Sequence, residues 1–302
     1  MEKTLSFRAD LHCHSIHSDG SLSPGELFQA ARAARLQGLS ITDHDTTAAY
    51  NLCSFQEAEK WGITLLPGVE ISTLHRGKRL HLLGYSFSLA EGTALQGLLQ
   101  EQRKKRRVRI YAMLQRLSDL GIALTCEELE KERGGEGSFL GRPDLAQLLW
   151  KKRWVSSPAE AYHRYIGDGA PCYVEGDYCT TQEAIALLHE AGGVAVIAHP
   201  HLIRKREEII ALESLPIDGL EVYYSRMSSQ MCAQWKKLAY RKGWLQTGGS
   251  DFHGVSKPKT SLGSSWIHWQ TFSHLHTLFC NNAPSLNWKR NEAMAFSAVG
   301  EA

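Results

Sequence analysis

Residues 10–19 constrain this chain more than any other stretch, because these ten residues contain three histidines and two aspartates. Residues 7–14 include a short apolar run and are predicted to form a strand that reaches the core. Side chains alternate in direction along a strand, so His12 and His14 point to the same side. One metal ion can therefore bind both imidazoles.

The same pattern of a short apolar run that ends in histidine, aspartate or glutamate recurs along the chain. The further predicted strands are residues 38–44, 63–70, 79–84, 194–200, 219–223 and 245–253. Helices with capping signals are predicted between several of them, at residues 23–37, 180–192 and 229–242. This alternation indicates parallel βαβ units, and in a β/α barrel the loops after the strands carry the active site.

The middle of the chain follows a different pattern. The alternation stops between residues 91 and 177, where helices are expected at residues 103–120, 126–133, 143–153 and 158–166. We therefore expect a discontinuous α/β domain, residues 1–90 and 178–284, interrupted by an all-helical insertion. Residues 285–302 form a C-terminal tail without a usable pattern.

Composition excludes several classes of protein. The 302 residues are 43% hydrophobic with a net charge of +2, so no global charge demands nucleic acid or a membrane surface. No apolar stretch approaches the roughly 20 residues of a membrane-spanning helix, and no signal pattern is evident, so we expect a cytoplasmic protein. The seven scattered cysteines form no CxxC pair, which favours reduced thiols over disulfides or cysteine zinc sites.

Nine residues at the predicted strand ends are candidate metal ligands. They are His12, His14, Asp19, His44, Glu70, His81, His199, Asp251 and His253. A single histidine near a strand end is usually structural, but nine such positions are hard to explain that way, because buried charge is costly unless paired or metal-bound. Imidazoles and carboxylates suit zinc, manganese and iron, and several close together suit a centre with more than one metal.

These residues lie in motifs that resemble those of the PHP (polymerase and histidinol phosphatase) superfamily. The motifs are His12-x-His14 with Asp19, Thr42-Asp43-His44-Asp45, Gly68-Val-Glu70, His81-Leu-Leu-Gly-Tyr85, Ala198-His199-Pro200 and Gly249-Ser-Asp251-Phe-His253. The insertion, with its basic first helix and Gly141-Arg142-Pro143, is similar to the TrpH-like branch. That branch contains 3′,5′-nucleoside bisphosphate phosphatases and 5′-3′ exoribonucleases acting on short RNA.

The resemblance implies a distorted (β/α)₇ barrel with two to three divalent ions (Mn, Zn or Fe) at its mouth. It places one metal on His12, His14, Glu70 and Asp251, with Glu70 bridging to a second metal on His81 and His199. It places the third on Asp19, His44 and His253. It also implies phosphoester hydrolysis by a metal-activated hydroxide, with a nucleotide or short RNA as substrate and no obligate protein partner.

Four further residues are expected near the substrate. Arg142 is the candidate phosphate clamp, with a salt bridge at a helix start as the alternative. Asp43 is expected to orient the site or contact substrate. His201 could contact substrate or donate a proton, or could be an exposed loop histidine. Relatives commonly have histidine where this chain has Asp144, and an acid there repels phosphate unless it is turned away or paired with a cation.

Residues 103–109 contain six cations in seven positions. On a helix these charges spread around the axis, so the run is either a solvated face or a guide for a polyanionic substrate. His17 could line the site, whereas the histidines at 75, 163, 189, 268, 274 and 276 match no motif and are taken as structural or surface residues.

Two other functions remain open from the sequence. One is a phosphatase for another small phosphomonoester, such as histidinol phosphate, although the helical insertion favours the nucleotide-acting branch. The other is a non-catalytic module that binds metal or nucleic acid. Every ligand position holds a competent residue, which favours retained catalysis.

Overall fold

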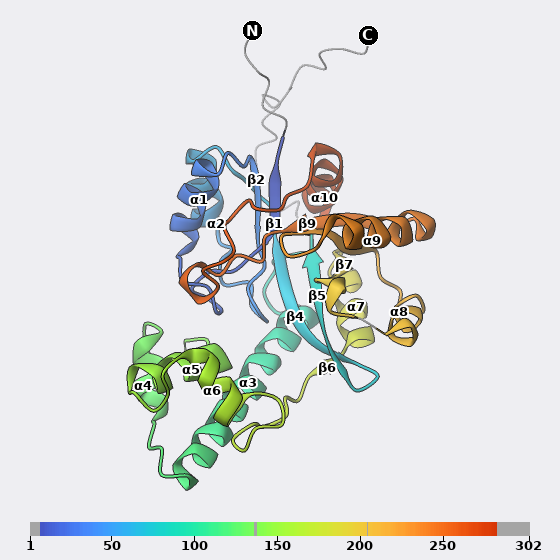
Figure 1. Ribbon diagram of the computed structural model, residues 1–302. Helices are drawn as coiled ribbons and strands as arrows, with labels where there is room; N and C mark the ends of the chain where they lie inside the picture. The colour runs from blue at the N-terminus through green and yellow to red at the C-terminus, as the bar shows by residue number, and fades with distance from the viewer. Residues whose placement is uncertain (1–6, 136–137, 204, 283–302) are drawn as a thin grey trace, which may run out of the picture.

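The computed structural model describes residues 7–135, 138–203 and 205–282, and the predicted tail at 285–302 lies outside them. Its strands form two sheets around which the helices pack (Figure 1). The first sheet is parallel and contains β1 (Ala9–Cys13), β2 (Gly38–Ile41) and β3 (Thr64–Leu65). The second has the order β6-β4-β5-β7-β8-β9, with β4 (Gly68–His75), β5 (Lys78–Tyr85), β6 (Cys179–Thr180), β7 (Val194–Ile197), β8 (Gly219–Tyr224) and β9 (Leu245–Gly249).

The expectation of a mixed α/β fold with parallel strand pairs is confirmed, but the closed seven-stranded barrel is not. Among the described residues, the backbone pairing between the two sheets is limited to isolated bridges. Cys13 pairs with Phe252, and His44 pairs with Glu70. Both bridges lie next to candidate ligands, so the place where regular pairing stops coincides with the site.

The parallel βαβ units expected from the alternation do not extend to β4 and β5. These two strands form an antiparallel hairpin, and β5 also pairs antiparallel with β7. Arg76 and Gly77 form the turn with φ values of 49° and 74°, the left-handed conformation that a type I′ turn requires at both positions. The strand expected at 63–70 is also two strands, because Pro67 interrupts it and cannot donate a ladder hydrogen bond.

The predicted helix starts of the α/β part are confirmed. Helix α1 (Pro24–Ala33) has a capping box on Ser23 and ends before residue 37. Helix α7 (Thr181–Glu190) starts after Thr180, and α9 (Ser229–Lys242) ends at Gly243 with a φ of 67°. Helices α2 (Leu52–Lys60), α8 (Arg206–Leu212) and α10 (Trp269–Asn282) had not been predicted. No helix in the described residues is long and apolar enough to cross a membrane.

The helices between β5 and β6 lie beside the sheets and have a core of their own (Figure 1). They are α3 (Ala94–Asp119), α4 (Cys126–Glu132), α5 (Arg142–Lys151), α6 (Pro158–Ala161) and a π-helical turn, Tyr162–Ile166. Helix α3 starts earlier than the predicted 103, because Leu95 and Leu99 pack into the core of the second sheet. Its second half carries Ile110 and Met113 into the insertion core. This helix therefore connects the helices between β5 and β6, which we call the insertion, to the sheets.

Candidate metal centre

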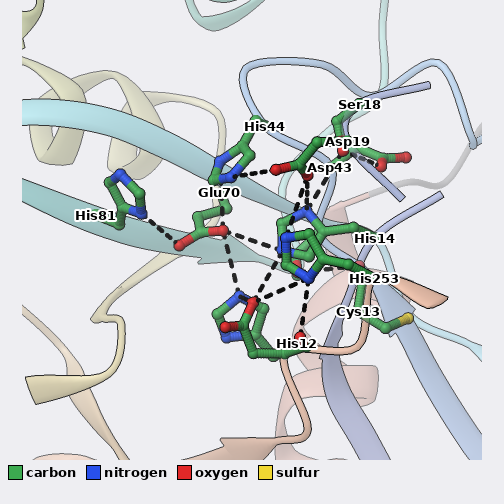
Figure 2. A network of polar contacts seen from close by, with 12 residues as sticks. His12, Cys13, His14, Ser18, Asp19, Asp43, His44, Glu70, His81 and His253 are labelled. Carbon is green, nitrogen blue, oxygen red and sulfur yellow. Dashed lines mark hydrogen bonds and ion pairs between the residues drawn. The ribbon is translucent and has the colours of Figure 1, made fainter. Parts of the chain in front are cut away.

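The strands and the loops that follow them bring the nine candidate ligands together at one place. Strand β1 presents His12 and, one residue past its end, His14, and both side chains are fully buried. Figure 2 shows these imidazoles around the carboxylate of Glu70, which lies on β4. The predicted alternation of side chains along the first strand thus places both imidazoles on one side.

The first group of ligands consists of His12, His14, Glu70 and Asp251. Nε2 of His12 lies 3.2 Å from Glu70 Oε2 and 3.4 Å from Asp251 Oδ1. Nε2 of His14 lies 3.1 Å and 3.4 Å from the same two oxygens. A tetrahedral zinc site with bonds of about 2.1 Å separates its ligand atoms by roughly 3.4 Å. The spacing of these four side chains therefore fits one ion between them.

The second group lies on the other side of the Glu70 carboxylate. Oε1 of Glu70 is 2.8 Å from His81 Nδ1 and 3.0 Å from His199 Nε2, while Oε2 faces the first group. Nδ1 of His44 is 3.3 Å from Oε2, so His44 also approaches this carboxylate. Since its two oxygens face different sets of imidazoles, Glu70 has the geometry of a bridging ligand.

The third group surrounds Asp19. Its Oδ1 is 3.2 Å from His253 Nε2 and 3.6 Å from His14 Nδ1, and its Oδ2 is 3.8 Å from His44 Nε2. These four side chains can place their ligand atoms within 4.8 Å of one another. The structure thus brings together the residues expected to hold a third ion and adds His14 to their surroundings.

Several buried polar atoms at this place lack a hydrogen-bond partner among the described residues. They include His14 Nε2, Asp19 Oδ1, His44 Nδ1 and His253 Nε2. Buried polar groups are normally hydrogen-bonded, because burial without a partner is costly. A divalent cation would satisfy these atoms together, and imidazole with carboxylate is a donor set that suits zinc, manganese or iron. The residues present therefore fit bound metal.

The charge of the centre favours a cation. Burial disfavours the ionised form of Glu70, but imidazoles including His44 and His81 hold its pKa well below the usual range. Burial also opposes protonation of His14, yet contacts with Asp251 and Glu70 raise its pKa to about 9. The acidic cluster thus draws a proton where a metal would otherwise supply positive charge, so metal binding and protonation compete here.

Two ligands sit on a strained backbone. His199 has a φ of 33° and Asp251 a φ of 57°, a left-handed region that non-glycine residues seldom adopt. Such strain persists where surrounding structure fixes the conformation, and it is common at functional sites. The conformation at both positions follows directly after a strand, β7 or β9, and turns the side chain toward the centre.

Residues not singled out as site residues from the sequence hold the ligands in place. Glu221, fully buried on β8, pairs with His12 Nδ1 at 2.8 Å and accepts a hydrogen bond of 2.6 Å from the His199 amide. Tyr224 and Lys257 donate to Asp251 Oδ2 at 2.8 and 2.9 Å. Such partners fix the orientation of metal ligands. A carboxylate inside the apolar segment 219–223 was a sequence signal that could have identified Glu221.

Asp43 is buried against the loop between β1 and α1, which carries Asp19 and which we call the first-motif loop. Its carboxylate accepts hydrogen bonds from the Ser15 amide at 2.7 Å, the Ser15 hydroxyl at 2.6 Å and the Ser18 hydroxyl at 2.5 Å. Figure 2 shows Asp43 beside Ser18. These bonds orient the loop that carries Asp19, while contact between Asp43 and substrate stays a prediction.

A chamber of about 180 Å³ lies between the metal centre and the helical insertion. Asp19, His44 and His81 line one part of it. Its cationic lining consists of Arg79, Arg106, Arg109 and Arg142, which together we call the arginine chamber. A cavity with four guanidinium groups beside candidate metal ligands suits an anion with several oxygens, such as phosphate.

Arg142, the predicted clamp, is the first residue of α5 and faces this chamber. Its guanidinium carbon lies 5.7 Å from the ring centre of Tyr162 and 5.5 Å from that of Tyr173. It also donates a hydrogen bond of 2.7 Å to Asp168. The arginine therefore makes the expected salt bridge at a helix start and also lines the chamber, while its role as a phosphate clamp stays a prediction.

Asp144 caps the start of its own helix and is paired with a cation. Its Oδ2 accepts a 2.7 Å hydrogen bond from the Gly141 amide, and its Oδ1 lies 3.2 Å from Arg133 Nε. Burial raises the pKa of Asp144 to about 6. Arg133 in turn donates to the carbonyl of Gly20 in the first-motif loop at 3.2 Å. Asp144 thus belongs to the contact between the insertion and that loop.

The basic run 103–109 lies in α3, and most of its cations contact protein groups. Arg106 donates to Asp45 at 2.5 Å and to Ser72 at 2.9 Å, and Arg109 donates to the carbonyl of Val174 at 2.7 Å. The run is therefore not simply a solvated face. Arg106 and Arg109 line the chamber. Arg103 contacts Thr46, outside the helices between β5 and β6, whereas Arg107 contacts Glu130 within them.

The remaining site predictions are placed as follows. The His201 ring lies 4.6 Å from that of Tyr224 and 6.4 Å from that of His199, close enough to the centre that its substrate and proton-donor roles stay open. His17 is half-buried in the first-motif loop.

A groove of about 790 Å³ starts at His81 and His199 and runs along the β4–β5 hairpin and α8.

The fold and the site define a class of enzyme, the metal-dependent hydrolases of phosphoric esters. The PHP domain family matches residues 10–175, more than half of the 302-residue chain. The chain belongs to this family, which confirms the resemblance drawn from its motifs.

Known proteins of similar sequence and structure have names that describe enzymes acting on phosphate esters. A 5′-3′ exoribonuclease of Haemophilus influenzae is 34% identical over 257 residues, which cover 82% of this chain and 91% of that protein. A 3′,5′-nucleoside bisphosphate phosphatase of Chromobacterium violaceum is 30% identical over 261 residues, which cover 84% and 90%. A solved structure from Bifidobacterium adolescentis, a candidate metal-dependent phosphoesterase, aligns with a TM-score of 0.80 and 29% identity over 89% of this chain and 96% of that chain.

Proposed function

We propose that this protein is a metal-dependent phosphoesterase of nucleotides, acting on 3′,5′-nucleoside bisphosphates, on the 5′ ends of short RNAs, or on both. The observation that carries the proposal is the arginine chamber directly beside Glu70 and its two sets of imidazoles. Bridged metals suit hydrolysis, and the arginines select a substrate with phosphate charge.

We infer that two to three divalent ions, manganese, zinc or iron, bind the three groups of ligands. Such ions lower the pKa of a water molecule and neutralise charge on a phosphate. Glu70 would hold two of them at a fixed separation. Glu221 would keep Nε2 of His12 directed at its ion through the hydrogen bond at Nδ1.

The residues of the chamber would bind and orient the phosphate. Arg142 offers a planar fork of donors, and Arg109 adds a second guanidinium that is almost completely buried. Burial strengthens the attraction between these cations and a phosphate, because water screens them less. The groove at His81 and His199 would receive the rest of a nucleotide or an RNA chain.

The same reasoning extends to the architecture. We infer that β1, β2, β4, β5, β7, β8 and β9 form one interrupted (β/α)₇-type barrel, since the two single bridges connect its sheets in that order. Residues 91–177 would then be an insertion that covers the barrel mouth, as the position of the chamber suggests.

The test is phosphate release from 3′-phosphoadenosine 5′-phosphate in the presence of manganese. Wild type is compared with His12→Ala and with His268→Ala, a matched change at an exposed histidine. We expect release by wild type and His268→Ala and a loss of at least about 10³-fold in His12→Ala. Equal rates in all three proteins would contradict the proposal, and no release by any would contradict its bisphosphate part.

A further inference from the structure

The loop 167–178 leads from the insertion back to the sheets and places a carboxylate at the edge of the arginine chamber. Oδ1 of Asp168 accepts a hydrogen bond of 2.7 Å from Arg142, and its Oδ2 accepts one from Arg79. The Asp168 side chain is nevertheless 58% exposed. One carboxylate therefore occupies two of the guanidinium groups that line the chamber.

Asp168 lies where the two cavities meet. It lines the larger groove, Arg142 lines the chamber, and Arg79 lines both. A substrate with its phosphate in the chamber and its remainder in the groove would pass this carboxylate. Its contacts with the arginines are then contacts that the phosphate itself would use.

We propose that Asp168 competes with substrate phosphate for Arg79 and Arg142 and so determines which anions enter the chamber. The inference rests on the proposed phosphoesterase function. A carboxylate and a phosphate offer oxygens with similar spacing to a guanidinium fork. A phosphate carries more charge and inside the chamber also meets Arg106 and Arg109, so it displaces Asp168 where a weaker anion does not.

The local structure allows this exchange. An ion pair with a largely exposed member adds little net stability, because water and salt screen it. Gly167 and Gly169 flank Asp168, and glycine allows the backbone more conformations than other residues do. Arg142 keeps its contacts with the rings of Tyr162 and Tyr173 when the carboxylate leaves. The clamp thus stays in position for the phosphate.

The alternative is that Asp168 positions the arginines for substrate. The two roles predict opposite changes in phosphate affinity when the carboxylate is removed. Removal of a competing carboxylate strengthens phosphate binding, whereas removal of a positioning carboxylate weakens it. The sign of the change in affinity therefore distinguishes them.

The experiment measures the inhibition constant of inorganic phosphate, and the KM for 3′-phosphoadenosine 5′-phosphate, in wild type, Asp168→Asn and Asp168→Ser. We expect both constants to fall by about two- to fivefold in the two variants, and the difference to shrink at high salt. The matched control is Asp177→Asn. Asp177 is 75% exposed on the same loop and pairs with Lys105 at 2.8 Å, so its removal changes net charge equally without freeing the clamp.

Constants in Asp168→Asn that equal those of Asp177→Asn, or that exceed those of wild type, would overturn the competitor role. If wild type cleaves the bisphosphate while these constants do not fall, only this inference fails. If no protein of the series binds phosphate or cleaves the bisphosphate, the proposed function fails with it.

Discussion

The metal centre and the arginine chamber are adjacent but are built differently. Most candidate ligands of the centre are buried, all lie on strands or in the loops after them, and their sequence motifs predicted their convergence. The cations of the chamber come from a hairpin, from α3 and from the start of α5, and three of them pair with carboxylates: Arg79, Arg106 and Arg142. The centre is fixed by the core of the α/β part, whereas the chamber depends on how the insertion packs against it.

This difference implies different responses to substitution. In the centre, each carboxylate contacts several imidazoles, so one change alters metal binding as a whole. In the chamber, each arginine contributes one part of an anion site, so changes should be graded and should affect substrate affinity. The comparison is supported if substitutions in the centre leave substrate affinity intact and substitutions in the chamber leave metal binding intact.

The largest effect is expected for Glu221→Gln. Glutamine cannot accept from both His12 Nδ1 and the His199 amide as a carboxylate does, so the ligands lose their fixed orientation. We expect metal affinity to fall by about 10–100-fold, with activity largely restored by excess manganese. Chelator competition measures the affinity. The control is Glu190→Gln, an exposed acid on α7, and equal affinities in both variants would count against a positioning role for Glu221.

An intermediate effect is expected for Arg142→Lys. A lysine keeps the charge but loses the planar fork of donors, so KM should rise by about tenfold while kcat changes little. Metal content, measured by elemental analysis, should stay at the wild-type value. Arg164→Lys makes the same chemical change at a partly exposed arginine that pairs with Glu160. Loss of metal in Arg142→Lys would show that the two regions are not separable in this way.

The sequence predicts the metal centre well and the arginine chamber poorly. The histidines and carboxylates of the centre follow short apolar runs, and strand geometry alone brings His12 and His14 together. Glu221 has the same signal, a carboxylate in a buried strand, but its contacts with His12 and with the His199 amide are long-range and have no motif of their own. For the antiparallel hairpin the sequence offers only a weak signal, Gly77, because glycine readily adopts the positive φ that its tight turn requires.

The contacts of the insertion could not be predicted in this way. The pairing of Arg106 with Asp45 joins residues 61 positions apart, and that of Asp144 with Arg133 depends on how α5 packs near the first-motif loop. Sequence periodicity locates a helix and its apolar face but not the side chain that a distant loop presents to it. A basic run such as 103–109 therefore predicts charge without predicting its partners.

The smallest effect is expected for Asp144→Asn, and it concerns stability. Burial raises the pKa of Asp144 from 3.8 to about 6, so the folded protein holds this proton more tightly than the unfolded chain. Its stabilising contribution is complete below pH 3.8 and is lost as pH rises through about 6. Asparagine does not titrate. Between pH 5 and 7, wild type should therefore lose about 1 kcal/mol of unfolding free energy relative to Asp144→Asn.

Urea unfolding of both proteins at a series of pH values, with equal metal content, measures this difference. Asp177→Asn serves as the control, because it makes the same chemical change at a position whose side chain is 75% exposed. A difference between wild type and Asp144→Asn that stays constant from pH 5 to 7 would mean that Arg133 fully offsets the burial of the carboxylate. Asp144 and Arg133 would then form a structural ion pair like those of the chamber. The packing of α5 against the first-motif loop would not weaken with rising pH.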